Sequence, residues 1–234
     1  MERAPQPVSG NRMMLAGAVL YLLEWVAILS SGGATGPSEL GKTSTADIVK
    51  LYTDNAKGAG FIFGWCAVVL FGRVLIMLGV KRAVAGTRHS AFANWAVAAM
   101  AASVAIEIVE LAVVAGTSHA VGSGSIDDSI VVALDAISAF LFNGIVGALG
   151  VSVAAASFAM HASRRFPAWI CWLGLAAGVL TMASAVLLGA SGGEDNGLRS
   201  AGSAVQGGIL LFWIWMLAGG IYLWRAPRGT EAVV

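Results

Sequence analysis

Five ionisable side chains interrupt long apolar stretches of this sequence, and their types suit proton chemistry. They are Glu24, Arg73, Glu107, Glu110 and Asp135. A charge held at membrane depth costs several kcal/mol unless it is paired, protonated or hydrated. Four carboxyl groups beside one guanidinium cannot all be ionised in an apolar site without leaving uncompensated charge. We therefore expect one or two of these acids to be neutral at neutral pH and able to donate a proton.

The spacing of the acids predicts a shared site. Glu107 and Glu110 are three residues apart, which places them at neighbouring positions on one helix face. Adjacent carboxyl groups can share a proton, so these two are the leading candidates for a catalytic acid, followed by Glu24 and Asp135. Counting along the predicted helices places all four in the outer half of the membrane. We predict that they line one cavity that opens outward. The alternative is that they only join helices by hydrogen bonds.

Aromatic and polar side chains near these acids would form the walls of such a cavity. The face of an aromatic ring stabilises a cation, as a reaction through carbocations requires. Arg73 is expected to bind an ionised carboxylate or a polar group of the substrate, with snorkelling toward the cytoplasmic interface as the alternative. Asn143 could instead be a simple contact between helices. The predicted substrate-binding residues are Arg73, Tyr21, Trp25, Trp65, Phe142, Asn143 and Trp213.

The elements that must position these residues are transmembrane helices. Hydrophobic residues make up 58% of the 234-residue chain and charged residues only 12%. About 20 apolar helical residues cross the hydrocarbon of a bilayer. The sequence therefore predicts one all-α domain, a polytopic bundle of six spans in contact with lipid. The predicted spans lie near residues 13–31, 60–80, 91–116, 129–152, 167–190 and 207–225.

A short helix is predicted between the first two spans, at Ser44–Gly58. Ser44 and Asp47 approximate a capping box, Ile48 and Tyr52 share an apolar face, and the final glycine suits a C-terminal cap. We expect this helix to lie on the outer membrane surface, as a packed connector or as a lid over an outward-facing cavity. A loop rich in small residues, from Ser191 onward, is expected to join the last two spans.

The distribution of basic residues predicts how the chain is oriented. Cytoplasmic loops of membrane proteins carry an excess of Lys and Arg. In the six-span arrangement nine basic residues fall on one side, which predicts a cell-membrane protein with both termini in the cytoplasm. These residues are Arg3, Arg12, Lys81, Arg82, Arg88, Arg164, Arg165, Arg225 and Arg228. A formal net charge of +1 and the lack of any nucleic-acid motif give no reason to expect a DNA or RNA partner.

The sequence predicts neither a metal ion nor a cofactor. The two cysteines, Cys66 and Cys171, lie in separate apolar stretches rather than in a redox pair or a metal-ligand spacing. The segment 125–129 contains adjacent aspartates, but it lacks the leading Asp of a D-x-D-D motif and the third Asp of D-D-x-x-D. We interpret Asp127 and Asp128 as ordinary loop acids.

In overall size and span layout, the chain resembles the small bacterial integral-membrane terpene cyclases of indole-sesquiterpenoid pathways. It also resembles an uncharacterised actinobacterial six-span family that opens with a pattern such as Arg12–Leu23. The cyclase resemblance implies that a membrane-embedded carboxylic acid protonates an alkene or epoxide, without metal-assisted loss of diphosphate. On this hypothesis the chain is a general-acid terpene cyclase, a lyase or isomerase acting on a hydrophobic isoprenoid.

Two other classes of function remain open at the level of sequence. A proton-coupled transporter would also place carboxyl groups and an arginine inside its helices, although it would more often show inverted repeats or broken helices near the midplane. A noncatalytic membrane scaffold would not require so many buried acids. The residues favour the enzyme first, the transporter second and the scaffold third.

Overall fold

The fold is an all-α bundle, as the sequence predicts. The computed structural model describes residues 11–30, 37–38, 43–193 and 196–226. Within these residues, six helical stretches are long and apolar enough to cross a membrane, so the chain is a multi-pass membrane protein. The helices are α1 (Met13–Leu22), α2 (Glu24–Ser30), α3 (Thr45–Asn55), α4 (Ala59–Val69), α5 (Phe71–Ala83), α6 (Ser90–Gly122), α7 (Asp128–Ser163), α8 (Ala168–Ala190), α9 (Gly197–Ala204) and α10 (Gly208–Arg225).

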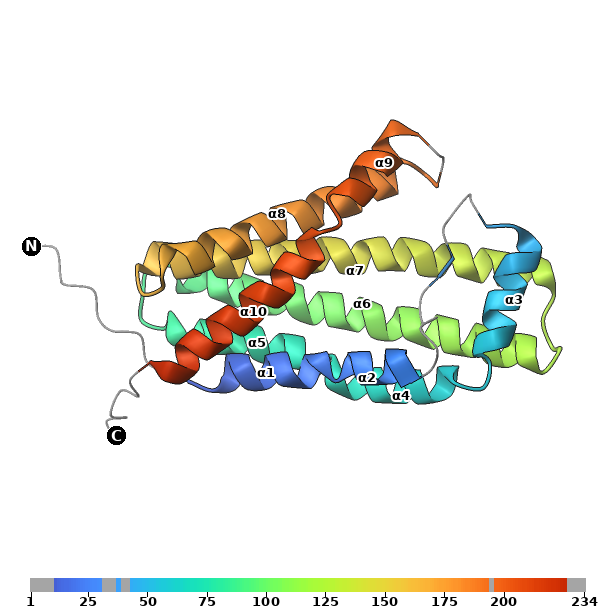
Figure 1. The fold of residues 1–234 in the computed structure, drawn as a ribbon, viewed down its shortest axis with the longest axis horizontal. Coiled ribbons are helices and arrows are strands. Elements are labelled where there is room, and N and C mark those ends of the chain that lie inside the picture. The colour runs from blue at the N-terminus through green and yellow to red at the C-terminus, as the bar shows by residue number, and fades with distance from the viewer. Residues whose placement is uncertain (1–10, 31–36, 39–42, 194–195, 227–234) are drawn as a thin grey trace, which may run out of the picture.

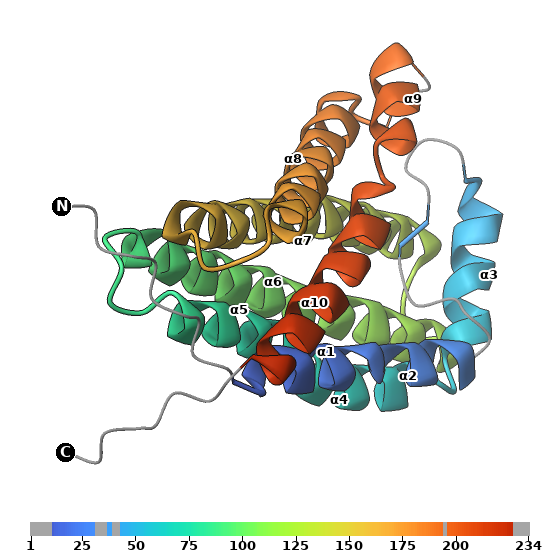
Figure 2. The same cartoon turned by 60° about the vertical axis from the view of Figure 1, so that its left-hand side comes forward.

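The two longest helices form the backbone of the bundle (Figure 1). Helix α6 packs against α7 along its length, and α7 packs against α8. Helices α1 and α2 lie end to end beside α4 and α5, while α8 and α10 tilt away from the long pair (Figure 2). Helix α3 crosses one end of the bundle, where it contacts α6 and α7.

One end of the bundle carries the basic residues, and we call it the basic end. Helix α1 begins there and α10 ends there, as an even number of spans requires (Figure 1). Helix α3 lies at the opposite end. The described basic residues at the basic end include Lys81, Arg82, Arg88, Arg164, Arg165 and Arg225.

The helices of spans three and four extend beyond the predicted spans. Helix α6 continues six residues past residue 116, and α7 continues eleven residues past residue 152. No proline interrupts either extension, so nothing in the sequence stops the helices at the width of a bilayer. With 33 and 36 residues, α6 and α7 reach about 50 Å, well beyond the hydrocarbon layer.

The connection between the last two spans is also more ordered than predicted. It contains α9, whereas the sequence predicted only a loop. The side chain of Asn196 caps this helix by accepting hydrogen bonds from the backbone N–H groups of Leu198 and Arg199, both at 3.1 Å. An asparagine before a run of small residues is a helix start signal that the glycine-rich composition obscured.

The helix between the first two spans is confirmed, with one change at its end. The Ser44 side chain accepts a hydrogen bond from the Asp47 backbone N–H at 3.2 Å, and Ile48 and Tyr52 are buried. The helix ends at Asn55, however, and Gly58 instead precedes the first residue of α4. The predicted C-terminal glycine cap is therefore wrong.

Spans one and two are each interrupted by a single residue just before a functional candidate. Leu23 separates α1 from α2 next to Glu24, and Leu70 separates α4 from α5 three residues before Arg73. At Leu23 the carbonyl oxygen accepts a hydrogen bond from the Trp65 indole N–H at 2.8 Å, which supplies a partner outside the helix. The chain remains helical on both sides of Leu23 and Leu70. Each interruption therefore changes the direction of the neighbouring side chains without unwinding the span.

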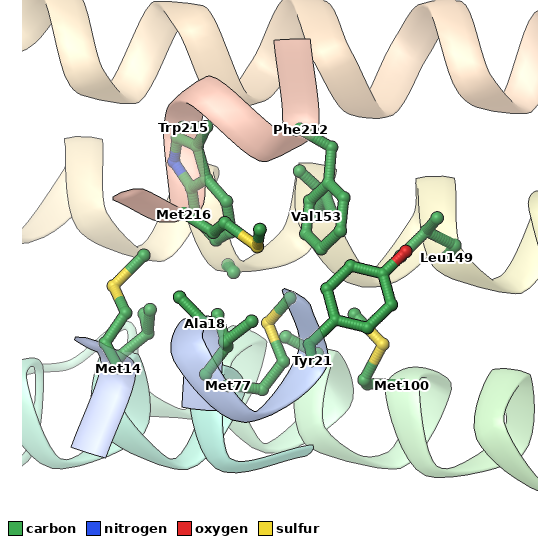
Figure 3. Packing of buried hydrophobic residues seen from close by; sticks show 14 of the residues in the cluster. Met14, Ala18, Tyr21, Met77, Met100, Leu149, Val153, Phe212, Trp215 and Met216 are labelled. Atoms are coloured by element: carbon green, nitrogen blue, oxygen red, sulfur yellow. The ribbon is translucent and has the colours of Figure 1, made fainter. Parts of the chain in front are cut away.

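Close backbone contact brings α1 against α5. A Cβ atom added to Gly17 would lie 2.4 Å from the Gly72 carbonyl oxygen, and one added to Gly72 would lie 2.5 Å from that of Gly17. Small residues allow such approach between transmembrane helices. Around this contact, methionines and aromatic rings such as Met14, Met77 and Trp215 fill the interior (Figure 3).

Substitution at this contact should destabilise the bundle. We expect Gly72→Ala to lower the free energy of unfolding in detergent by about 1–3 kcal/mol, because the added methyl group overpacks two backbones. Gly64→Ala is the matched control, since a Cβ atom there meets nothing within 4 Å. Equal melting temperatures for the two variants would show that the α1–α5 contact is not as close as described.

Candidate functional site

All five ionisable candidates point into the bundle. The exposed fraction is 1% for Asp135, 2% for Arg73, 3% for Glu110 and 8% for Glu24. The Glu107 side chain is 15% exposed. By contrast, large apolar side chains such as Val19, Leu29 and Trp95 lie on the outside of the helices. Polar residues inside and apolar residues outside are the arrangement that a bilayer favours.

Arg73 and Glu107 form an ion pair in the bundle core. The pair joins α5 to α6, and the guanidinium carbon of Arg73 lies 5.2 Å from the centre of the Tyr21 ring. Of the two partners predicted for Arg73, a carboxylate and a polar group of the substrate, the carboxylate is the one that lies beside it here. Because Glu107 faces a cation, it is stabilised as a carboxylate, and Glu110 is left without an ion-pair partner among the described residues.

Glu24 and three aromatic residues lie beside this ion pair. Glu24 is within electrostatic reach of Arg73. Next to it in the chain, Trp25 packs edge to face on Trp213, with ring centres 4.9 Å apart. The predicted residues Tyr21, Glu24, Trp25, Arg73, Glu107 and Trp213 thus form one group, which we call the core cluster.

Asp135 lies in a second group, nearer to α3. Its Oδ1 atom accepts hydrogen bonds from the Ser38 backbone N–H at 2.9 Å and from the Tyr52 hydroxyl at 3.1 Å. Its Oδ2 atom accepts a further, short hydrogen bond from the Ser38 hydroxyl. These three contacts tie α7 to α3 and to the segment at residues 37–38.

Tyr52 is held as a proton donor in this group. Burial raises the pKa of the Tyr52 phenol, and the carboxyl group of Asp135 raises that pKa further. A phenol with a raised pKa keeps its proton throughout the physiological range. Tyr52 therefore presents an O–H group to Asp135 at any pH at which the protein is expected to work.

A cavity of about 300 Å³ lies on the other side of Ser38, between α7, α8 and α9. We call it the Ser38 cavity. Asp135, Ala139, Phe142 and Asn143 recur at helical spacing, so the α7 face that carries the acid continues into the cavity wall. None of the four acids is among the lining residues, which are Pro37, Ser38, Ala139, Phe142, Asn143, Leu188, Ser191, Gly193, Arg199, Ser203 and Gln206.

The structure therefore places the predicted site residues in two groups instead of one. Phe142 and Asn143 line the Ser38 cavity, and Asp135 lies behind Ser38. The core cluster contains six of the other predicted residues, and Glu110 lies within electrostatic reach of Tyr52, the hydrogen-bond partner of Asp135. Trp65 belongs to neither group, because it lines an apolar groove between the first two spans and donates its indole N–H to Leu23.

Several residues of this region were not among the predicted site residues. Tyr52 was assigned only to the apolar face of its helix, although a buried tyrosine hydroxyl normally requires a partner. Ser38 gave no sequence signal. The cavity also contains Arg199, whose Nη1 atom donates to the Gly193 carbonyl oxygen at 2.9 Å. That arginine belongs to a helix the sequence did not predict.

The comparisons add no relative to this description. No family model, curated protein or solved structure matches the chain. Within the part of the chain that the structure describes, no group of three His, Cys, Asp or Glu side chains is placed to hold a metal ion.

Proposed function

We propose that the protein is a membrane-embedded enzyme that protonates an unsaturated isoprenoid and thereby starts its cyclisation, with Asp135 as the acid. One observation carries this proposal. A carboxyl group that is 1% exposed shares its hydrogen-bond partner Ser38 with the wall of a 300 Å³ cavity. Ligand-sized cavities begin at about this volume. The carboxyl group of Asp135 is thus shielded from bulk water, and only the Ser38 hydroxyl group separates it from a molecule bound in the cavity.

The proposed proton transfers conserve atoms and charge, and they involve only Asp135, Ser38 and the substrate. In the reactive form Asp135 carries the proton and donates it to the Ser38 oxygen, while the Ser38 hydroxyl proton adds to a carbon of the alkene. A hydroxyl both donates and accepts, so Ser38 can serve both steps. Ring closure moves the positive charge along the carbon skeleton, and loss of a proton to the Asp135 carboxylate through Ser38 ends the reaction. The product is an isomer of the substrate.

The walls of the cavity suit an amphiphilic substrate of this class. The Phe142 ring offers a face that stabilises a carbocation, and Leu188 adds apolar surface. Asn143, Ser203 and Gln206 can hold a polar end of the molecule by hydrogen bonds. This lining resembles ordinary small-molecule sites, in which a few polar groups orient a ligand within apolar walls.

Proton-coupled transport is the second candidate, favoured by the interruptions at Leu23 and Leu70 beside Glu24 and Arg73. The buried residues between Arg73 and the basic end argue against transport. Beyond Arg73 in that direction, no carboxyl, guanidinium, amino or imidazole side chain is buried among the described residues, and Met14, Met77 and Met160 are fully buried there. An apolar interior of this kind gives a proton or a polar substrate no path across the membrane.

We also propose that the basic end faces the cytoplasm of a cell membrane, which places both termini inside. The support is the gathering of Lys81, Arg82, Arg88, Arg164, Arg165 and Arg225 at one end. In this orientation the Ser38 cavity lies in the outer half of the membrane. Labelling of a single cysteine introduced between residues 85 and 89 tests the orientation, since reagent added outside intact cells should not reach it.

The proposed activity is tested with purified protein in detergent and a panel of linear isoprenoid alcohols, epoxides and prenylated aromatic compounds. We expect at least one member of the panel to yield a cyclic product of unchanged mass. A proton-driven uptake signal in vesicles, together with no conversion of any panel member, would favour the transporter instead.

A further inference from the structure

The packing of α6 on α7 shows where Glu110 lies relative to the Asp135 group. The Ser152 hydroxyl donates to the Ala96 carbonyl oxygen at 2.6 Å, and the Ser103 hydroxyl donates to that of Ile145 at 3.0 Å. Between these two bonds α6 advances by seven residues while α7 goes back by seven. The same antiparallel register, continued by two further turns, places Glu110 level with Ser138.

Glu110 and Ser138 present polar atoms that have no partner at this level. Glu110 is 3% exposed and Ser138 is fully buried. Among the described residues, Oε1 of Glu110 and Oγ of Ser138 have no hydrogen-bond partner. Buried polar atoms are nearly always bonded, so atoms of this kind indicate a functional role or a changing arrangement.

Tyr52 lies between these atoms and Asp135. Its hydroxyl donates to Asp135, and both Glu110 and Ser138 are within electrostatic reach of the same hydroxyl. Asp135 is one helical turn from Ser138 on α7. Glu110 from α6, Tyr52 from α3 and the two α7 residues thus meet at one buried level, where α3 covers the long helices (Figure 1).

We propose that Tyr52 relays a proton between Glu110 and Asp135. The neutral acid of Glu110 donates to the Tyr52 oxygen, either directly or through the Ser138 hydroxyl, while the Tyr52 hydroxyl proton passes to the Asp135 carboxylate. One O–H bond breaks and one forms at each step, and no other reactant is needed. Glu110 thus supplies the proton that brings Asp135 into its reactive form, and this role depends on the proposed function of Asp135 as the acid.

A neutral Glu110 fits its surroundings better than an ionised one. The titratable and charged groups that face Tyr52 from the helices packed on α3 are Glu110 on α6 and Asp135 on α7. Neither is a cation, and Arg73, the buried cation of the core cluster, is already paired with Glu107. An unpaired buried carboxylate would keep the full cost of its lost hydration.

Infrared spectroscopy of the purified protein tests the relay without any substrate. The C=O stretch of a protonated carboxyl group shifts when its hydrogen is replaced by deuterium, so transfer into D₂O reports exchange at Glu110. We expect a protonated-carboxyl band that disappears in Glu110→Gln. In Tyr52→Phe the exchange of this band should slow about tenfold or more, because the hydroxyl group that joins Glu110 to Asp135 is lost.

Tyr222→Phe is the matched control for this measurement. Tyr222 lies at the basic end and donates to the Arg165 carbonyl oxygen at 3.1 Å, far along the chain from the acids. In Tyr222→Phe the exchange rate of the Glu110 band should equal that of the unsubstituted protein. No Glu110 band, or equal exchange rates in Tyr52→Phe and Tyr222→Phe, would overturn the relay.

If Tyr52→Phe does not fold, a second variant tests the relay. In Asp135→Asn the Glu110 band should shift in frequency, because Tyr52 loses its carboxylate acceptor, and an unshifted band would contradict the coupling. These measurements also separate the two proposals. If exchange slows in Tyr52→Phe but no cyclic product forms with any substrate, the relay is supported and the proposed enzyme is rejected. If a cyclic product forms but exchange is unaltered in Tyr52→Phe, the enzyme is supported and the relay is rejected.

Discussion

Asp135→Asn should lower product formation by about 10²–10⁴-fold, the usual contribution of a general acid. The amide has nearly the shape of the carboxyl group but no acidic proton. It retains one oxygen that can accept from Ser38 or Tyr52, so the variant should fold. Its free energy of unfolding should fall by about 1–3 kcal/mol, because one of the three donors to Asp135 loses its acceptor. Initial rates and melting curves of the same preparation measure both effects.

Asp127→Asn is the control for this substitution. Asp127 is an exposed aspartate that directly precedes α7, the helix that contains Asp135. The activity and stability of the Asp127→Asn variant should stay close to those of the unsubstituted protein. If Asp135→Asn were as active as Asp127→Asn, Asp135 would not be the acid, and its hydrogen bonds would serve only to hold α3 and residues 37–38 on the bundle.

Glu107→Gln should cause the largest loss of stability among the acid-to-amide variants. It leaves the Arg73 guanidinium charged and 2% exposed, with the Tyr21 ring and the carboxyl group of Glu24 as its remaining neighbours. Removing one member of a buried ion pair typically costs about 3–5 kcal/mol. We expect this loss in the free energy of unfolding measured in detergent.

The double variant Arg73→Met with Glu107→Leu is the informative comparison. Replacing both charges by apolar groups of similar size removes the uncompensated cation, so most of the lost stability should return. A single Glu107→Gln variant as stable as the unsubstituted protein would show that Arg73 reaches another acceptor and that the core ion pair does not support the fold.

The sequence was sufficient for the architecture because that part depends on long, uniform patterns. Six apolar stretches separated by polar segments predict the spans, and a serine followed three residues later by an aspartate predicts the start of α3. Helix ends were harder, because apolar length indicates what a bilayer can accommodate and not where a helix stops. The extension of α7 from residue 152 to Ser163 is an example.

The burial of the five ionisable residues was predictable, but their grouping was not. A charged residue in a membrane helix is visible in the sequence, and all five candidates do face the interior. Which acid meets the arginine depends on helix rotation and register, and these are determined by side-chain packing across the bundle. Glu107 and Glu110 are one turn apart on α6, yet Glu107 faces Arg73 while Glu110 lies level with Ser138.

The contacts made by Ser38 and Tyr52 could not be derived from spacing. Ser38 is 97 residues from Asp135 and Tyr52 is 83 residues from it. A single serine in a loop offers no periodicity, and hydrogen bonds over such separations form only when α3 and residues 37–38 settle on the completed bundle. The Ser38 cavity likewise depends on α9, whose existence the glycine and serine content of that connection obscured.

The most direct test of the proposed acid chemistry is the reaction carried out in D₂O. If a proton from Asp135 adds to an alkene carbon, the cyclic product formed in D₂O should contain deuterium bound to carbon, at the position where protonation begins. The same incubation with Asp135→Asn should give no labelled product above the background without protein. With an alkene substrate, a cyclic product that forms in D₂O without carbon-bound deuterium, or equally well with Asp135→Asn, would contradict proton-initiated cyclisation by Asp135.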